Sequence, residues 1–114
     1  MTMYHWDLPQ YIQDLGGWTN PLVVQYFEHY ADVLFEKFGD RVKRWITFNE
    51  PTLFCGRGYG SGIFAPNVRS PGEGEYLCGH YTLLSHAKVY HLYKNRYAAH
   101  VLNGTGQIGI CLYS

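Results

Sequence analysis

Apolar residues recur every three or four positions in two long stretches of the chain, and shorter runs of β-branched and aromatic residues separate them. Over residues 22–38 this spacing predicts a helix. Asn20 and Pro21 supply a cap and a first-turn proline at its start, and Gly39 ends it. The apolar sector is wider than the usual stripe of about 100°. We therefore expect this helix to contact a sheet and flanking helices together, with its aromatic side chains in the core.

A second long helix is predicted from residue 73 to about residue 102, and Asn103-Gly104 ends it. Residues 55–74 carry glycines at alternate positions and then two prolines, which predicts a long loop. This loop follows a strand of the predicted sheet. We therefore expect it on the same face as any active site, where it would shape the outer side of a cleft.

Three runs have the composition of strands: residues 1–9, 42–48 and 107–113. A helix lies between each pair of runs, so the order is strand, helix, strand, helix, strand. Two strands joined by a crossover helix form a βαβ unit, and such strands run parallel. The sequence therefore predicts an α/β fold.

Polar side chains gather at the carboxyl ends of two of these strands. Pro51 cannot donate to a sheet ladder and biases the residue before it toward an extended conformation, so the second strand ends at Glu50. His5, Trp6 and Asp7 stand at the carboxyl end of the first strand. Parallel strands open onto the same end of a sheet, which is where ligands bind in α/β folds. A carboxyl, an imidazole, an indole and the amide of Asn49 converging there would suit a polyhydroxylated ligand.

Asn49 and Glu50 pose a geometric difficulty, because adjacent residues of a regular strand point to opposite faces. Both side chains are nevertheless expected to reach one ligand. We therefore predict that the strand becomes irregular, bulged or strongly twisted, between Phe48 and Pro51.

Several motifs occur in order over nearly the whole chain. They are Tyr4-His5-Trp6-Asp7-Leu8-Pro9, Phe38-Gly39-Asp40-Arg41-Val42, Trp45-Ile46-Thr47-Phe48-Asn49-Glu50-Pro51, and Cys78-Gly79-His80 through His86-Ala87-Lys88. Together they resemble glycoside hydrolase family 1, which contains the β-glucosidases, and most closely its animal, insect-like members. The resemblance implies a (β/α)8 TIM barrel of retaining glycosidases. A complete barrel needs on the order of 250 residues, and this chain has 114. We therefore expect residues 1–114 to be a fragment of a single catalytic domain, an incomplete barrel of about two and a half βα units around its third to fifth strands.

The resemblance also implies roles for individual residues. Glu50 would be the catalytic general acid/base, Asn49 would bind the sugar's 2-hydroxyl, and His5 would bind a ring hydroxyl. Trp6 is interpreted as packing near the pocket floor rather than contacting the sugar. The family's nucleophile lies in a Thr-Glu-Asn-Gly motif that does not occur in this chain, and Asp7 is rejected in that role.

The resulting hypothesis is part of a β-glucosidase-like retaining β-glycosidase that hydrolyses O-glycosidic bonds of β-glucosides. The isolated chain is expected to be inactive because it lacks the nucleophile. One alternative is a catalytically dead barrel relative that binds glycans or a protein partner. Another is a product truly this short, acting by association.

Composition narrows the expected partners. The formal net charge is +0, so neither nucleic acid nor an anionic membrane is expected as a partner. The partner expected is a small-molecule β-glycoside or oligosaccharide, with no cofactor. Aromatic residues make up 18% of the chain, which suits a large core and a carbohydrate-compatible cleft.

The cysteines Cys55, Cys78 and Cys111 form no Cys-x-x-Cys motif, and no spacing with the histidines matches a zinc motif, so no metal site is expected. Buried free thiols are the favoured interpretation, although one disulfide is left open for a secreted parent. Asn103-Gly104-Thr105 is an N-glycosylation sequon and a weak pointer to a secreted, extracellular protein.

Overall fold

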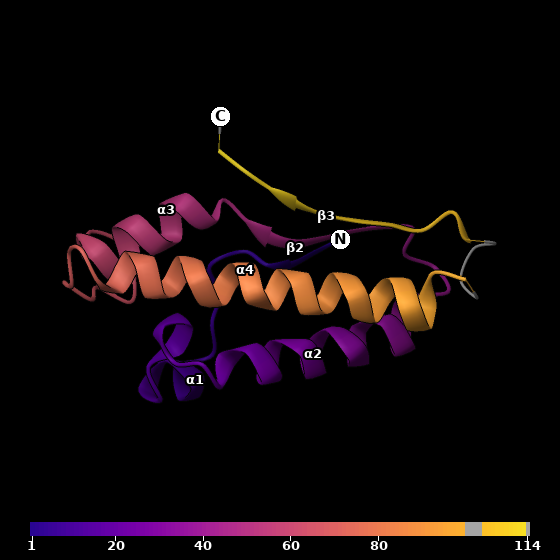
Figure 1. The fold of residues 1–114 in the computed structure, drawn as a ribbon, viewed down its shortest axis with the longest axis horizontal. Coiled ribbons are helices and arrows are strands. Elements are labelled where there is room, and N and C mark those ends of the chain that lie inside the picture. Colours follow the sequence, from indigo (N-terminus) through magenta and orange to yellow (C-terminus); the bar gives the residue numbers. More distant parts are fainter. Residues whose placement is uncertain (100–103, 114) are drawn as a thin grey trace.

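The computed structural model describes residues 1–99 and 104–113. Its strands form one parallel sheet in the order β1-β2-β3 (Figure 1). Their bounds are β1 Thr2–Tyr4, β2 Arg44–Asn49 and β3 Gln107–Cys111. The predicted α/β class and the parallel strand order are confirmed, and the last strand ends two residues earlier than predicted.

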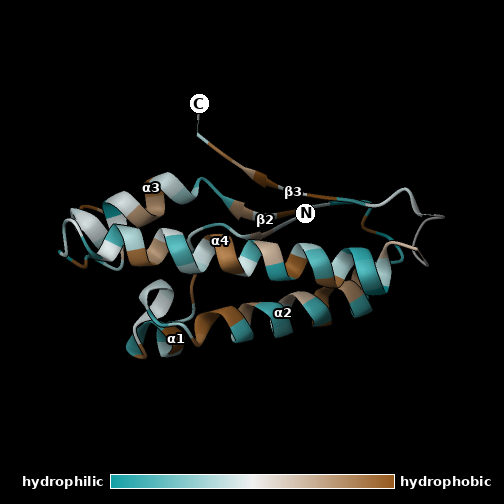
Figure 2. Cartoon of the chain, in the orientation of Figure 1, coloured by the Kyte–Doolittle hydropathy of each residue, from teal (hydrophilic) through white to brown (hydrophobic). Residues whose placement is uncertain are grey.

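Two long helices cover one side of the sheet and lie side by side (Figure 1). They are α2 (Val23–Phe38), which connects β1 to β2, and α4 (Gly74–Leu92), which precedes β3. The shorter elements are α1 (Gln10–Asp14), the 3-10 turn η1 (Gly17–Thr19), α3 (Pro51–Cys55), and the π-helical turns η2 (Gly56–Gly60) and η3 (Tyr93–Tyr97). Hydrophobic and hydrophilic residues follow one another along α4 (Figure 2), which packs against α2, α3 and the sheet.

Aromatic side chains form the contact between sheet and helices. Phe48 of β2 is fully buried, stacks on Phe27 of α2 with ring centroids 4.5 Å apart, and meets the ring of Trp18 edge-on at 5.1 Å. Further along the same helix, Phe35 meets Trp45 edge-on at 5.1 Å. Aromatic pairs in such geometries stabilise a core beyond the area that they bury. The core therefore lies directly behind the carboxyl ends of β1 and β2.

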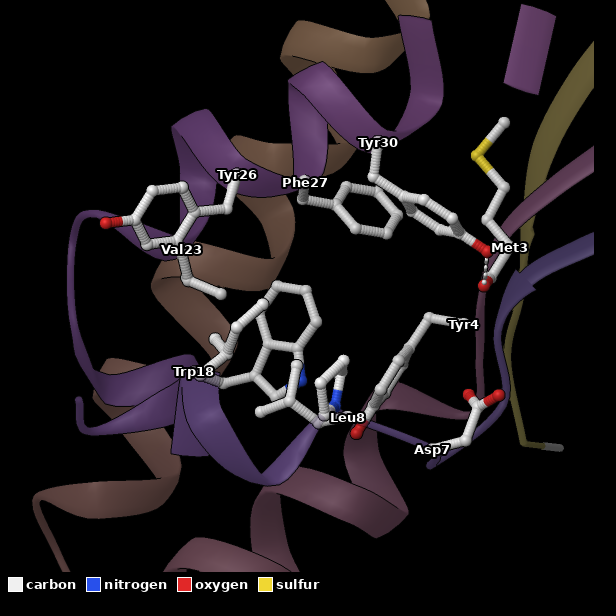
Figure 3. A pocket seen from close by; sticks show the side chains of 11 residues that line it. Met3, Tyr4, Asp7, Leu8, Trp18, Val23, Tyr26, Phe27 and Tyr30 are labelled. Atoms are coloured by element: carbon white, nitrogen blue, oxygen red, sulfur yellow. Dashed lines mark hydrogen bonds between the residues drawn. The ribbon is translucent and has the colours of Figure 1, made fainter. Parts of the chain in front are cut away.

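The expectation that all aromatic residues of α2 lie in the core is wrong for three of them. Tyr26, Tyr30 and Phe38 keep 43%, 43% and 42% of their surface exposed. Tyr26 and Tyr30 lie at the rim of a mainly apolar cavity of about 250 Å³, whose wall includes Trp18 (Figure 3). The wide apolar sector thus presents more surface than the described residues cover.

The predicted loop at residues 55–74 is wrong over its first part. The chain is helical from Pro51 to Gly60, and Pro51 fits the first turn of α3, where a missing N–H costs nothing. Two of the alternating glycines, Gly58 and Gly60, allow close packing, whereas Gly62 has a φ of +71°. A Cβ on Gly58 would lie 2.9 Å from the carbonyl oxygen of Ala65, and one on Gly60 would lie 3.1 Å from Glu75.

The second predicted helix is divided in the structure. The α-helix α4 ends at Leu92 and continues as the π-helical turn η3 to Tyr97. Gly104 has φ +75°, a left-handed conformation that favours glycine, in the predicted turn before the last strand. Asn103, the sequon asparagine, lies outside the described residues.

The favoured interpretation of the cysteines as free thiols is wrong for two of them. Cys55, at the end of α3, forms a disulfide with Cys78 in α4, with Cα atoms 5.4 Å apart. Cys111 is free and partly exposed. The two bonded cysteines are 23 residues apart in sequence. Only the packing of α3 against α4 brings them together.

One histidine connects the second long helix to the central strand. His86 Nδ1 of α4 lies 2.7 Å from the hydroxyl oxygen of Thr47, and that hydroxyl also lies 3.3 Å from the carbonyl oxygen of Gly109. Thr47 is fully buried. Burial lowers the pKa of His86 below the ordinary value of 6.5. The neutral imidazole is therefore the form that the folded protein favours.

The disulfide predicts the pattern of thiol modification. When the protein is denatured without reductant and alkylated, mass spectrometry should find only Cys111 modified, and all three cysteines after reduction. Replacing Cys78 by Ala should lower the free energy of unfolding by about 2–4 kcal/mol. Alkylation of all three cysteines without reductant would contradict the pairing.

The lowered pKa of His86 predicts a pH-dependent stability. Because the unfolded chain binds this proton first, the free energy of unfolding should fall as the pH drops below about 6.5, and the His86 contribution should level off below the folded-state pKa. His86→Gln should flatten this part of the pH dependence, as measured by denaturant unfolding at a series of pH values. The exposed His29→Gln controls for removing an imidazole as such. An unchanged slope in His86→Gln would refute the assignment.

Candidate active site

The first two strands end side by side, and this brings together two of the predicted site residues. Tyr4 of β1 is paired with Phe48 of β2, so the next residues, His5 and Asn49, are neighbours. Asn49 Nδ2 lies 3.2 Å from His5 Nε2. An amide nitrogen only donates, so His5 Nε2 is the acceptor in this contact. The imidazole and the amide are therefore held at one end of the sheet.

The central strand contains an extra residue just before this end. β2 pairs Ile46 with Gly109 and Asn49 with Cys111, so that three steps along β2 match two along β3. This is the signature of a β-bulge. Its effect is visible in Thr47 and Phe48, which are adjacent and yet both contact the helices, through His86 and Phe27. The predicted irregularity of the strand is confirmed, and it begins one residue earlier than predicted.

Glu50 follows the bulge and has an unusual backbone conformation. Its φ is 50° and its ψ is 62°, in the left-handed region, where we had predicted an extended residue. Pro51 disfavours the right-handed helical region for Glu50, so the residue that precedes α3 takes another conformation. The carbonyl oxygen of Glu50 accepts a hydrogen bond from the N–H of Leu53 at 3.0 Å, which closes the first turn of α3.

The peptide group that joins Asn49 to Glu50 is hydrogen-bonded on both sides. Its carbonyl oxygen accepts from the indole Nε1 of Trp6 at 2.9 Å, and its N–H, which belongs to Glu50, donates to the carbonyl oxygen of Cys111 at 2.9 Å. One bond therefore comes from the segment after β1 and the other from β3. The side chain of Glu50, partly buried, projects from a fixed point between the three strands.

Trp6 lies at this end of the sheet and not in the core. Its side chain is 39% exposed, and its ring lies tilted against Phe64 with centroids 5.6 Å apart. The guanidinium group of Arg57 lies over the same Phe64 ring, 5.2 Å from its centroid. The segment after η2 therefore returns to the end of the sheet that carries Glu50, as expected for a loop that borders a cleft.

Asp7 holds the turn that follows β1. Its carboxylate oxygen accepts a hydrogen bond from the backbone N–H of His5 at 3.1 Å. This bond spans Trp6, whose φ is 71°. Carboxylate side chains commonly stabilise such turns. The observed contact of Asp7 is thus a structural one.

Sequence reasoning missed the role of Tyr59. Its side chain is 2% exposed, and its hydroxyl donates to Gln13 Oε1 at 2.6 Å and accepts from the backbone N–H of Trp18 at 3.2 Å. Burial raises the pKa of this phenol, so it stays protonated and can donate. These bonds connect η2 to α1 and η1. A tyrosine inside a glycine-rich stretch carries no sequence signal for such contacts.

Two further properties concern the described residues only. Within 1–99 and 104–113, no three side chains of His, Cys, Asp or Glu gather closely enough to hold a metal ion. Over the same residues, no helix has both the length and the apolar character that crossing a membrane requires.

The sequence is similar to that of known glycoside hydrolases. The sequence matches the family described as Glycosyl hydrolase family 1 over residues 1–114. Myrosinase 1 of Brevicoryne brassicae is 57% identical over 97 residues, which cover 85% of this chain and 21% of that protein. Human lactase/phlorizin hydrolase is 52% identical over 97 residues, covering 85% of this chain and 5% of that protein.

The solved structures agree with these relatives. The structure of an aphid myrosinase superposes with a TM-score of 0.90 at 53% identity, covering 96% of this chain and 23% of that one. A β-glucosidase from Thermotoga maritima, in complex with noeuromycin, superposes with a TM-score of 0.86 at 39% identity, covering 97% of this chain and 24% of that one. The chain spans about a quarter or less of the lengths of these four proteins. It belongs to glycosyl hydrolase family 1, and its fold is part of the TIM barrel of these glycoside hydrolases.

Proposed function

We propose that this chain supplies the general acid/base and part of the sugar-binding pocket of a retaining β-glycosidase. The observation that carries the proposal is the contact of His5 with Asn49, at the end of a parallel sheet and one residue before Glu50. An imidazole, an amide and a carboxyl at this place match what hydrolysis of a glycoside requires. Because the chain spans about a quarter or less of its relatives, we propose that it works as one segment of a complete barrel.

Glu50 would act twice in the reaction. In the first step its carboxyl group protonates the glycosidic oxygen as the bond from this oxygen to the anomeric carbon breaks and a second carboxylate forms a bond to that carbon. In the second step the Glu50 carboxylate takes a proton from water, whose oxygen displaces the second carboxylate. The half-buried position of Glu50 beside the bulge suits both steps, since it keeps the group near the sheet while leaving it open to water.

The second carboxylate lies outside the motifs of this chain. A retaining mechanism requires the two carboxyl groups about 5–5.5 Å apart. Asp7 is at the same end of the sheet, but its carboxylate is bonded to the backbone of His5. We therefore propose that another part of the barrel supplies the nucleophile and that the 114-residue chain alone does not hydrolyse glycosides.

His5 and Asn49 would bind the sugar. A hydroxyl group both donates and accepts, so two sugar hydroxyls can bond to the imidazole and the amide that here bond to each other. Asn49 is the nearer to Glu50 in sequence and would contact the 2-hydroxyl, a bond that strengthens in the transition state. His5 would contact a neighbouring ring hydroxyl. The relatives are named myrosinase, lactase and β-glucosidase, and we propose a β-glucoside as substrate of this protein.

We also propose that the protein is secreted. The disulfide between Cys55 and Cys78 supports this, because disulfides persist in oxidising compartments and are rare in the cytosol. The sequon at Asn103 points the same way.

Expression in animal cells tests the proposal that the protein is secreted. The protein should appear in the medium, and enzymatic removal of N-glycans should lower its mass; retention inside the cells without glycan would contradict it.

The role of Glu50 predicts a selective loss of activity. In the full-length protein that carries this chain, Glu50→Gln should lower kcat/KM for alkyl β-glucosides by about 10²–10⁴-fold, because their leaving groups need a proton. The wild type should hydrolyse a chromogenic aryl β-glucoside in the same assay. The exposed Glu73→Gln, a matched carboxyl-to-amide change, should retain wild-type activity. Equal activity of Glu50→Gln and the wild type would disprove the assignment.

A further inference from the structure

The peptide group before Glu50 is held from two directions. Trp6 Nε1 bonds to its oxygen and the carbonyl of Cys111 bonds to its N–H, at 2.9 Å each. The two partners come from opposite neighbours of β2 in the sheet. A peptide group bonded on both sides cannot rotate about its flanking torsions without breaking both bonds.

This restraint matters because Glu50 is in a conformation that a non-glycine residue rarely adopts. Its φ of 50° is strained, and such a conformation persists only where the surrounding structure imposes it. With this peptide group held on both sides, φ of Glu50 sets the direction of its Cα–Cβ bond relative to the sheet. The direction in which the carboxyl group leaves the sheet therefore depends on the orientation of this one peptide group.

Trp6 is itself held in place to make its bond. It too has a positive φ, 71°, which is unusual for a bulky residue. The bond from His5 N–H to the Asp7 carboxylate closes the turn around it, and the ring of Phe64 lies against its indole. Two strained residues, one after each strand, are thus connected by a single side-chain hydrogen bond. A ring that only filled space would need neither the strain nor the bond.

We propose that Trp6 is a positioning residue for the acid/base, acting through the carbonyl oxygen of Asn49. The inference rests on the proposed function of Glu50 and adds the means by which its carboxyl group is aimed at the departing oxygen. It makes a specific demand on the kinetics. Misdirecting the acid harms bond cleavage most when the leaving group needs a proton, and least when the leaving group is already stable as an anion.

Two other roles for Trp6 predict different effects of its loss on the kinetics. If the indole stacked on the sugar, its loss would affect all substrates of one sugar equally, because they share that sugar. If the indole only supported the fold, its loss would lower the free energy of unfolding without changing how kcat/KM depends on the leaving group. The dependence of kcat/KM on the leaving group separates these cases, since kcat/KM reports the steps up to the first bond cleavage.

The experiment uses the full-length protein and a series of β-glucosides whose leaving-group pKa runs from that of 2,4-dinitrophenol to that of an alkyl alcohol. Trp6→Phe removes the indole N–H and keeps an aromatic ring against Phe64. If Trp6→Phe does not fold, benzothienylalanine at position 6 keeps the shape of the indole and removes only the donor. Trp45→Phe is the matched control, because the buried Nε1 of Trp45 has no hydrogen-bond partner among the described residues.

Loss of the donor is expected to lower kcat/KM on the order of tenfold to a hundredfold for the alkyl glucoside. For the dinitrophenyl glucoside it should change kcat/KM by less than about threefold, because this leaving group needs little protonation. Trp45→Phe should keep the wild-type dependence on the leaving group. An equal loss for all substrates, or none, would overturn the positioning role while leaving the role of Glu50 intact. A wild-type protein without hydrolytic activity would overturn both.

Discussion

The extra residue in β2 is the constraint on which the candidate site depends. Three steps along β2 match two along β3 between Ile46 and Asn49. Side chains of a regular strand alternate between faces; the bulge shifts that alternation before Asn49, and the left-handed Glu50 breaks it after Asn49. With the bulge, Thr47 and Phe48 both face the helices, and the chain arrives at Asn49 turned toward His5. The bulge thus converts a buried strand into the base of a polar site within two residues.

The structure supports this local distortion from behind and from both sides. Behind it, Phe48 is fully buried against Phe27 and Trp18. On either side, Trp6 and Cys111 bond the peptide group that leads into Glu50. Beyond it, the disulfide from Cys55 ties α3 to α4. A strained residue is retained at a functional site only when such contacts outweigh its cost, and here they come from both neighbours of β2 and from the core behind it.

The sequence predicted local structure more reliably than it predicted contacts between distant residues. The parallel strands, α2, and the convergence of His5 with Asn49 followed from periodicity, from prolines and from the rule that parallel strands end together. The motifs also identified the family. Other features were misread because the sequence offered a stronger local interpretation. The glycines at 58 and 60 suggested a loop, whereas they allow Ala65 and Glu75 to approach a helical turn closely. Pro51 suggested an extended Glu50, whereas Glu50 is left-handed at the start of α3.

What the sequence determined by itself is the three strands, the two long helices and the polar residues that follow the first two strands, because hydrophobic period and breaker residues act over a few positions. Only the tertiary structure decided which groups bond to one another. The pairing of Cys55 with Cys78, the contacts of Tyr59 and the bond from Trp6 to the carbonyl of Asn49 each join residues 23 or more positions apart. Partners so distant leave no local pattern, since the distance between them is set by how sheet and helices pack.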